Sequence, residues 1–185
     1  VDASDLADPR LLGDIVLGDD RWDSQAVVAT TDRLAFVAGS SGPTAGIDVV
    51  DVSDPTAPRP AGTIPGLVDR VAALGDRHLL ASVRAGRATE VRVYDLADPA
   101  APTLAARLAL SRTVNSLVTD GSYAYIADPQ GLTILDLRAP DRPTLLAEIA
   151  LPDGDARDVA VADGYAYIGA LRFFVVDVRD PAQPR

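Results

Sequence analysis

Short apolar runs separated by turn residues recur along the whole chain. One group has runs at 145–151, 158–161, 165–170 and 173–178, with Asp163-Gly164 between the second and third. Val, Ile, Tyr and Phe are frequent in these runs, and such residues suit the pleated surface of a sheet. Asp-Gly between two runs is a strong hairpin signal. Runs of this length predict four antiparallel strands, and no segment shows the 3.6-residue apolar period of a capped helix.

A ten-residue motif closes each group of runs. It stands at Val176–Arg185 and recurs without a gap at residues 1–10, 50–59, 94–103 and 135–144. Its first Asp occupies positions 2, 51, 95, 136 and 177, at separations of 49, 44, 41 and 41 residues. A period in the low forties is typical of one propeller blade per repeat.

The residue types of the motif are those that favour a turn followed by an edge strand. An Asp before a turn accepts backbone N–H bonds, and a Pro at the next turn position fixes φ. The second Pro suits the start of an edge strand, because it has no N–H to donate. We therefore interpret Asp51, Asp95, Asp136 and Asp177 as structural residues.

The pattern predicts an all-β protein, a β-propeller of four blades with four antiparallel strands each. It forms one domain over residues 1–185, with repeats at approximately 2–50, 51–94, 95–135 and 136–177 and a partial motif at 178–185. We expect the N-terminal run Leu11–Leu17 to complete the last blade, a closure that removes open sheet edges. Since both ends carry the motif, a four-blade segment of a larger propeller or array is the alternative. Eight blades from two chains are a further solution.

The amino-acid composition limits which kinds of partner the protein is expected to bind. All 17 basic residues are Arg, 25 of the 27 acidic residues are Asp, and the net charge is −10. Such a chain repels phosphate backbones, so nucleic acid is excluded as an expected partner. No apolar run reaches 18 residues, so we expect no membrane insertion. The absence of Cys excludes disulfides and thiolate metal sites. The Arg and Asp bias is itself explained by GC-rich codons.

Catalytic residue types are scarce. His78 is the only His, and it aligns with Tyr123 and Tyr165, so it is expected to replace a packing aromatic. We therefore predict no catalytic residues and no enzyme. No cofactor is expected either. Calcium is the most plausible metal, because the acidic clusters at 19–23 and 153–155 offer carboxylate oxygens. Neither cluster has the spacing of a complete loop site, and solvated acidic loops are the simpler explanation.

The start of each inner strand offers the best candidate binding site. The aligned residues there surround the mouth of a propeller channel, and Trp and Arg are typical anchors of recognition surfaces. The candidate binding residues are Trp22, Gln25, Arg70, Arg112, Asn115, Arg157 and Asp158. Their simpler alternative is mutual neutralisation between neighbouring blades.

The strand-to-turn junctions resemble a known family. Ile47–Asp51, Val91–Asp95, Leu132–Asp136 and Phe173–Asp177 are similar to the motif that names the LVIVD repeat, and 163–168 looks like the preceding hairpin. The resemblance covers essentially the whole chain. It implies a β-propeller of bacterial or archaeal secreted or cell-surface proteins, and it brings no agreed catalytic motif.

These observations lead to three hypotheses of function. The first is a non-enzymatic binding or scaffold module of an extracellular or cell-surface protein, which binds a protein or a glycan through the propeller rim. The second is a propeller hydrolase or lyase that uses carboxylates such as Asp158. The third is an inert spacer or assembly unit of a longer surface protein, for which self-association through open blade edges would be the sign.

Overall fold

A computed structural model describes residues 8, 10–17, 27–39, 45–85, 88–152 and 154–185. The described residues form fifteen strands and no helix, which confirms the all-β prediction. The first blade is β1 (Val27–Thr30), β2 (Leu34–Gly39), β3 (Gly46–Asp51) and β4 (Arg59–Pro65). The second is β5 (Val68–Leu74), β6 (His78–Ala85), β7 (Ala88–Asp95) and β8 (Thr103–Leu110). The third is β9 (Ser116–Thr119), β10 (Tyr123–Asp128), β11 (Gly131–Asp136) and β12 (Thr144–Ala150), and the fourth is β13 (Asp158–Ala162), β14 (Tyr165–Gly169) and β15 (Phe173–Asp177).

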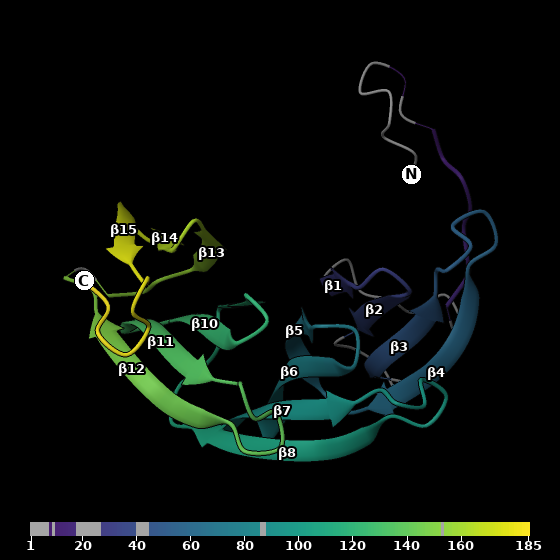
Figure 1. Cartoon of the computed structure of the whole chain (residues 1–185), viewed down its shortest axis with the longest axis horizontal. Helices are drawn as coiled ribbons and strands as arrows, with labels where there is room; N and C mark the ends of the chain where they lie inside the picture. The colour runs from purple at the N-terminus through teal and green to yellow at the C-terminus, as the bar shows by residue number, and fades with distance from the viewer. Residues whose placement is uncertain (1–7, 9, 18–26, 40–44, 86–87, 153) are drawn as a thin grey trace.

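Each sheet is an antiparallel meander in which neighbours in sequence are neighbours in space. The four sheets follow one another around an open arc (Figure 1). The first strands β1, β5, β9 and β13 contact one another in turn along its inner side. The sheet order confirms four propeller blades.

The four copies of the motif that lie wholly within the described residues form the same turn. The Oδ1 atom of its first Asp accepts a backbone N–H two residues on, at 2.8 Å in Asp95 and 3.1 Å in Asp177. Asp51 and Asp136 make the same bond. In each of the first three blades, the pairing between the third strand and the outermost strand shifts register next to this turn. In the third blade the shift lies between Ile134 and Leu135. The motif thus ends one strand and starts the outermost one.

The core lies between consecutive blades. Phe36, Ile47 and Val49 of the first blade are fully buried against the second blade. Tyr125 and Ile134 of the third blade are buried in the same way against the fourth. Each of the first three blades therefore buries one apolar face on the next, which is how a repeat unable to bury its own face becomes stable. No helix in the described part is long and apolar enough to cross a membrane.

The expected closure of the last blade by Leu11–Leu17 is wrong in this structure. The last sheet contains three strands in the described residues, and residues 11–17 are not paired with β15. They lie beside the first blade instead, where Gly13 is adjacent to Pro55 and Pro58. The fourth position of the last blade is started by Arg185, which exchanges two backbone hydrogen bonds with Asp177 at 2.6 and 3.0 Å.

Candidate functional site

Strand direction alternates in every sheet, so the connections fall on two faces. The motif turns lie on one face, with the β5–β6, β9–β10 and β13–β14 hairpins. The opposite face, called the loop face below, carries the connections at 66–67, 111–115, 129–130, 151–157 and 170–172. Five predicted site residues lie at or just before the loop-face ends of inner strands: Arg70, Arg112, Asn115, Arg157 and Asp158.

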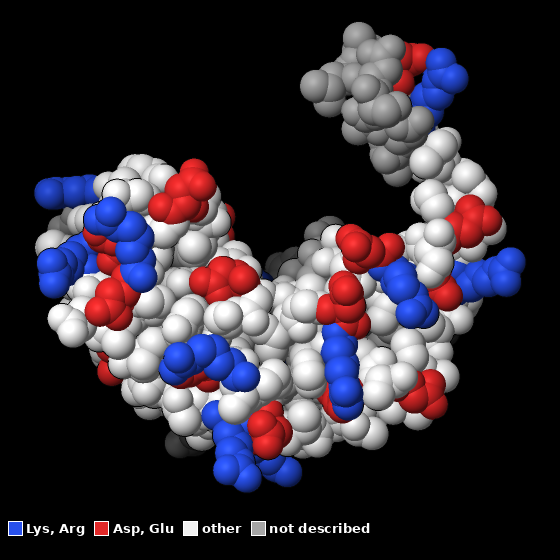
Figure 2. Space-filling model, in the orientation of Figure 1, with Lys and Arg blue, Asp and Glu red and all other residues white. Residues whose placement is uncertain are grey.

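The surface charges are mixed. Figure 2 shows basic side chains next to acidic ones over the face in view. Paired examples are Arg77 with Asp95 at 2.8 Å and Arg138 with Asp136 at 2.6 Å. The hydrogen bond from Arg77 lowers the pKa of Asp95 to about 2, and that from Arg179 does the same for Asp177. These pairs lie within one blade or one motif turn, so they are not the pairs between neighbouring blades that the sequence suggested.

Arg70 and Asn115 lie close together, and each donates to the backbone of the neighbouring blade. Arg70 Nε donates to the carbonyl oxygen of Asn115 at 2.6 Å. The Asn115 side-chain amide donates to the carbonyl oxygen of Ala156 at 2.7 Å. These two bonds join the second blade to the third and the third to the fourth. Both side chains are half-buried, so their first role here is to hold the blades in register.

Asp158 has a similar contact. Its Oδ1 atom accepts a hydrogen bond from Ser116 Oγ at 2.7 Å, again between the third and fourth blades. The strand registers place Arg70, Ser116 and Asp158 at equivalent positions, opposite Ser82, Ala127 and Gly169. Ser116 was not among the candidates named from the sequence. The loops before these strands differ in length, and the apolar pattern alone does not fix which residue of each strand forms its first pair.

Arg157 stands apart from these contacts. Its guanidinium pairs with Asp155 at 2.8 Å, and its side chain is 75% exposed. The segment that carries it is fixed by three backbone bonds: Asp155 N–H to Pro129, Ala156 N–H to Asp128, and Arg157 N–H to Gly169. Arg157 is thus an exposed cation on a segment that two blades hold in place.

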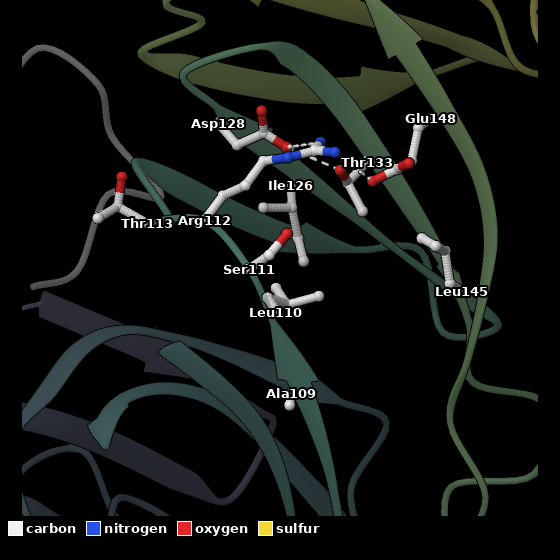
Figure 3. A pocket seen from close by; sticks show the side chains of 10 residues that line it. All are labelled: Ala109, Leu110, Ser111, Arg112, Thr113, Ile126, Asp128, Thr133, Leu145 and Glu148. Carbon is white, nitrogen blue, oxygen red and sulfur yellow. Dashed lines mark hydrogen bonds and ion pairs between the residues drawn. The ribbon is translucent and has the colours of Figure 1, made fainter. Parts of the chain in front are cut away.

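Arg112 lines a small cavity at the same face (Figure 3). The side chain reaches from the β8–β9 connection to Asp128 at 3.3 Å and to Glu148 at 2.9 Å. The cavity has a volume of about 90 Å³ and is also lined by Leu110 and Leu145. It is large enough for a few water molecules or one small group of a larger ligand.

Asp128 is the buried anchor of this cavity and was missed by the sequence analysis. Its side chain is 3% exposed. Oδ1 accepts the N–H groups of Gln130 and Gly131, while Oδ2 accepts Thr133 Oγ1 at 2.7 Å in addition to Arg112. The Asp-Pro-Gln-Gly turn at 128–131 was the available signal, because Asp before a turn caps backbone N–H groups.

Two predicted site residues, Trp22 and Gln25, lie outside the described residues, as do the acidic cluster at 19–23 and Asp153. Asp155, from the other acidic cluster, pairs with Arg157. Among the described residues, no group of three or more His, Asp or Glu could hold a metal ion.

Known protein families and solved structures that resemble this chain agree on the fold. The LVIVD repeat model matches residues 34–64, 111–149 and 153–185, which is more than half of the chain, so the chain belongs to the LVIVD repeat family. No curated protein matches.

Solved structures are similar in fold at low identity. A functionally unknown protein from Desulfotomaculum acetoxidans superposes with a TM-score of 0.70 at 16% identity, over 86% of this chain and 54% of that one. The β-propeller domain of Cps50 (Swd1) from Myceliophteria thermophila gives 0.63 at 10%, over 85% and 53%. The computationally designed Ika4 protein gives 0.62 at 14%, over 88% and 97%. The chain thus spans about half the length of the two natural structures.

Proposed function

We propose that this propeller is a non-enzymatic binding or scaffold module of an extracellular or cell-surface protein. Its ligand is a protein or a glycan, and its binding surface is the loop face around Arg157. The repeat family and the propeller fold support the general class. The ligand class, the location and the absence of catalysis are our proposal.

The observation that carries this proposal is the exposure of Arg157 on a fixed segment. Backbone bonds to the third and fourth blades hold residues 155–157, so the backbone that carries Arg157 needs little further ordering when a ligand binds. Binding loses less free energy when the binding groups are pre-ordered. The exposed carboxylate of Asp155 pairs with the guanidinium, and the exposed carboxylate of Asp158 follows at the start of β13. Both offer acceptors for hydroxyl or amide groups of a ligand. Arg112 and its cavity add a recess on the same face.

The test is a binding screen on the immobilised chain. The panel contains neutral and acidic oligosaccharides and purified extracellular proteins, with surface plasmon resonance as the measurement. For any ligand found, Arg157→Ala is expected to weaken binding at least about tenfold, equivalent to about 1.4 kcal/mol. Arg142→Ala is the matched control, because Arg142 is also exposed and acid-paired but lies in a motif turn on the opposite face.

Two outcomes would contradict the proposal. Equal loss of binding in both variants would place the ligand elsewhere or indicate non-specific charge effects. Failure of the whole panel to bind, together with turnover of a glycan, would favour the enzyme hypothesis.

A further inference from the structure

A cleft lies between the third and fourth blades on the face of the motif turns, opposite the loop face. Its walls come from the β9–β10 hairpin and β10 of the third blade, and from the β13–β14 hairpin and the motif turn of the fourth. The volume is about 430 Å³, which is within the range of clefts that hold ligands. We call it the hairpin cleft, and its lining includes Asp120, Tyr123, Tyr125, Val161, Asp163 and Arg179.

The arginine that pairs with the motif Asp comes from a different place in the last two blades. In the second blade Arg77, in the β5–β6 hairpin, pairs with Asp95. In the third and fourth blades the partner is Arg138 or Arg179, which lies in the motif turn itself. The residues directly before the second strands of the four blades are, in order, Arg33, Arg77, Ser122 and Gly164. The two hairpins that border the cleft therefore have no arginine of their own.

Each of these two hairpins carries an exposed Asp, Asp120 or Asp163. Among the described residues, no Arg forms an ion pair with either carboxylate. Asp120 is held in place, because Oδ1 accepts the N–H of Ser122 and Oδ2 accepts the Tyr125 hydroxyl, both at 2.9 Å. Burial raises the pKa of Tyr125, so its hydroxyl stays protonated and keeps donating. The cleft thus offers two carboxylates that lack a described cationic partner.

Arg179 lines the cleft but is already engaged. Its Nε donates to both carboxylate oxygens of Asp177, and its guanidinium lies over the ring of Tyr165 at 5.5 Å. Its aliphatic part packs on Gly164, where a Cβ would clash with Arg179 Cγ. An anionic ligand would have to compete with Asp177 for this guanidinium. A cationic ligand meets no such competitor at Asp120 and Asp163.

We propose that the hairpin cleft binds a Lys or Arg side chain from a basic segment of another protein. The cationic head pairs with Asp120 and Asp163, and charge-assisted hydrogen bonds of this kind are the stronger ones. The aliphatic stem packs on Tyr123 and Val161, as long basic side chains do on apolar surface. The net charge of −10 attracts basic segments to the molecule. The site is independent of the function proposed for the loop face, and together the two faces would let one propeller hold two partners.

The experiment is an NMR titration of the ¹⁵N-labelled chain with two pools of capped hexapeptides. The third residue is Arg in one pool and Gln in the other, and the remaining positions are randomised among Gly, Ala, Ser, Leu and Tyr. The Arg pool is expected to shift the backbone amides of 119–125 and 161–165, with a dissociation constant of about 1 mM or lower. The Gln pool is expected to leave these amides unchanged.

Asp163→Asn removes one carboxylate and keeps the turn, because Asn tolerates the φ of 53° at this position. It is expected to weaken binding of the Arg pool by about threefold or more. Asp76→Asn is the matched control, since Asp76 is exposed in the equivalent hairpin of the second blade beside Arg77 and its loss changes the net charge equally. This control and Arg157→Ala, on the loop face, are both expected to leave binding unchanged.

Three results would overturn the proposal. The first is no shift with the Arg pool at millimolar concentration, and the second is an equal response to the Gln pool. The third is an equal loss of binding in Asp163→Asn and Asp76→Asn, which would indicate a general charge effect. Because Arg157→Ala tests the loop face separately, failure at the hairpin cleft and failure at the loop face are distinguishable.

Discussion

At the scale of the residue, Asp128 shows how a buried charge becomes tolerable. Burying an unpaired carboxylate is costly, and the cost falls only when each oxygen has donors. Asp128 has two backbone N–H groups, the Thr133 hydroxyl and the Arg112 guanidinium. Arg112 is in turn shared with Glu148 at the surface. The carboxylate thus fixes both the β10–β11 hairpin and the connection that leads into β9.

Replacement of Asp128 is therefore expected to destabilise the protein strongly. Asp128→Ala leaves Arg112 half-buried without its buried partner and removes the acceptor of several donors, at a cost of about 3 kcal/mol. Urea unfolding followed by fluorescence measures this change. Asp141→Ala is the control, because Asp141 is an exposed partner of Arg142, and it is expected to change stability by less than about 0.5 kcal/mol. Equal effects of the two variants would contradict a buried anchoring role.

At the scale of the element, the motif turns depend on ionised carboxylates. Arg77 donates two hydrogen bonds to Asp95, at 3.1 and 2.8 Å, and Ala97 N–H donates a third at 2.8 Å. These donors favour the charged form, so the pKa of Asp95 falls from 3.8 to about 2. A lowered carboxyl pKa adds stability that is present above the unfolded pKa and is lost as the pH falls through the folded pKa.

The turns should accordingly weaken between about pH 4 and pH 2, the window between the unfolded pKa and the folded one. In an NMR titration, the Asp95 carboxyl is expected to titrate near pH 2. Arg77→Ala should raise this midpoint toward 3.8, because the largest cause of the shift is removed. Arg142→Ala should leave it unchanged. A midpoint that Arg77→Ala does not move would mean that the backbone N–H alone sets the pKa of Asp95.

The strands and motif turns could be predicted from local sequence, whereas the contacts between blades could not. The run at 158–161 corresponds to β13 and the run at 145–151 to β12 within one residue. Arg112 was found as a candidate, but its partner Glu148 is distant in sequence and no local pattern joins them. The sequence also marked Leu11–Leu17 as an outer strand, but a strand pattern does not say which blade the strand joins, and in the structure Gly13 lies beside Pro55 of the first blade. Trp22 and Gln25 stay predictions.

At the scale of the whole molecule, polar bonds along the inner strands join the blades in series. Arg70 joins the second blade to the third, and Asn115 and the Ser116–Asp158 bond join the third to the fourth. Thr119 Oγ1 adds a bond to the carbonyl oxygen of Ala73. In a repeat protein, stability is the sum of repeat and interface contributions. A change at one interface should therefore loosen the blade beyond it more than a distant blade.

Asn115→Ala tests this series arrangement. The substitution leaves the Ala156 carbonyl without the amide that donates to it, at a cost of about 1–2 kcal/mol at the interface of the third and fourth blades. Hydrogen exchange followed by mass spectrometry is expected to show faster exchange in β13–β15, while β5–β8 keep their protection. Gln130→Ala, a change in an exposed turn of the third blade, is the control and should leave both regions unchanged. Uniform loss of protection in all four blades would mean that the propeller unfolds as one cooperative unit. In that case the order of the loop face would depend on all four blades. The backbone bonds of residues 155–157 alone would then not hold Arg157 in position for binding.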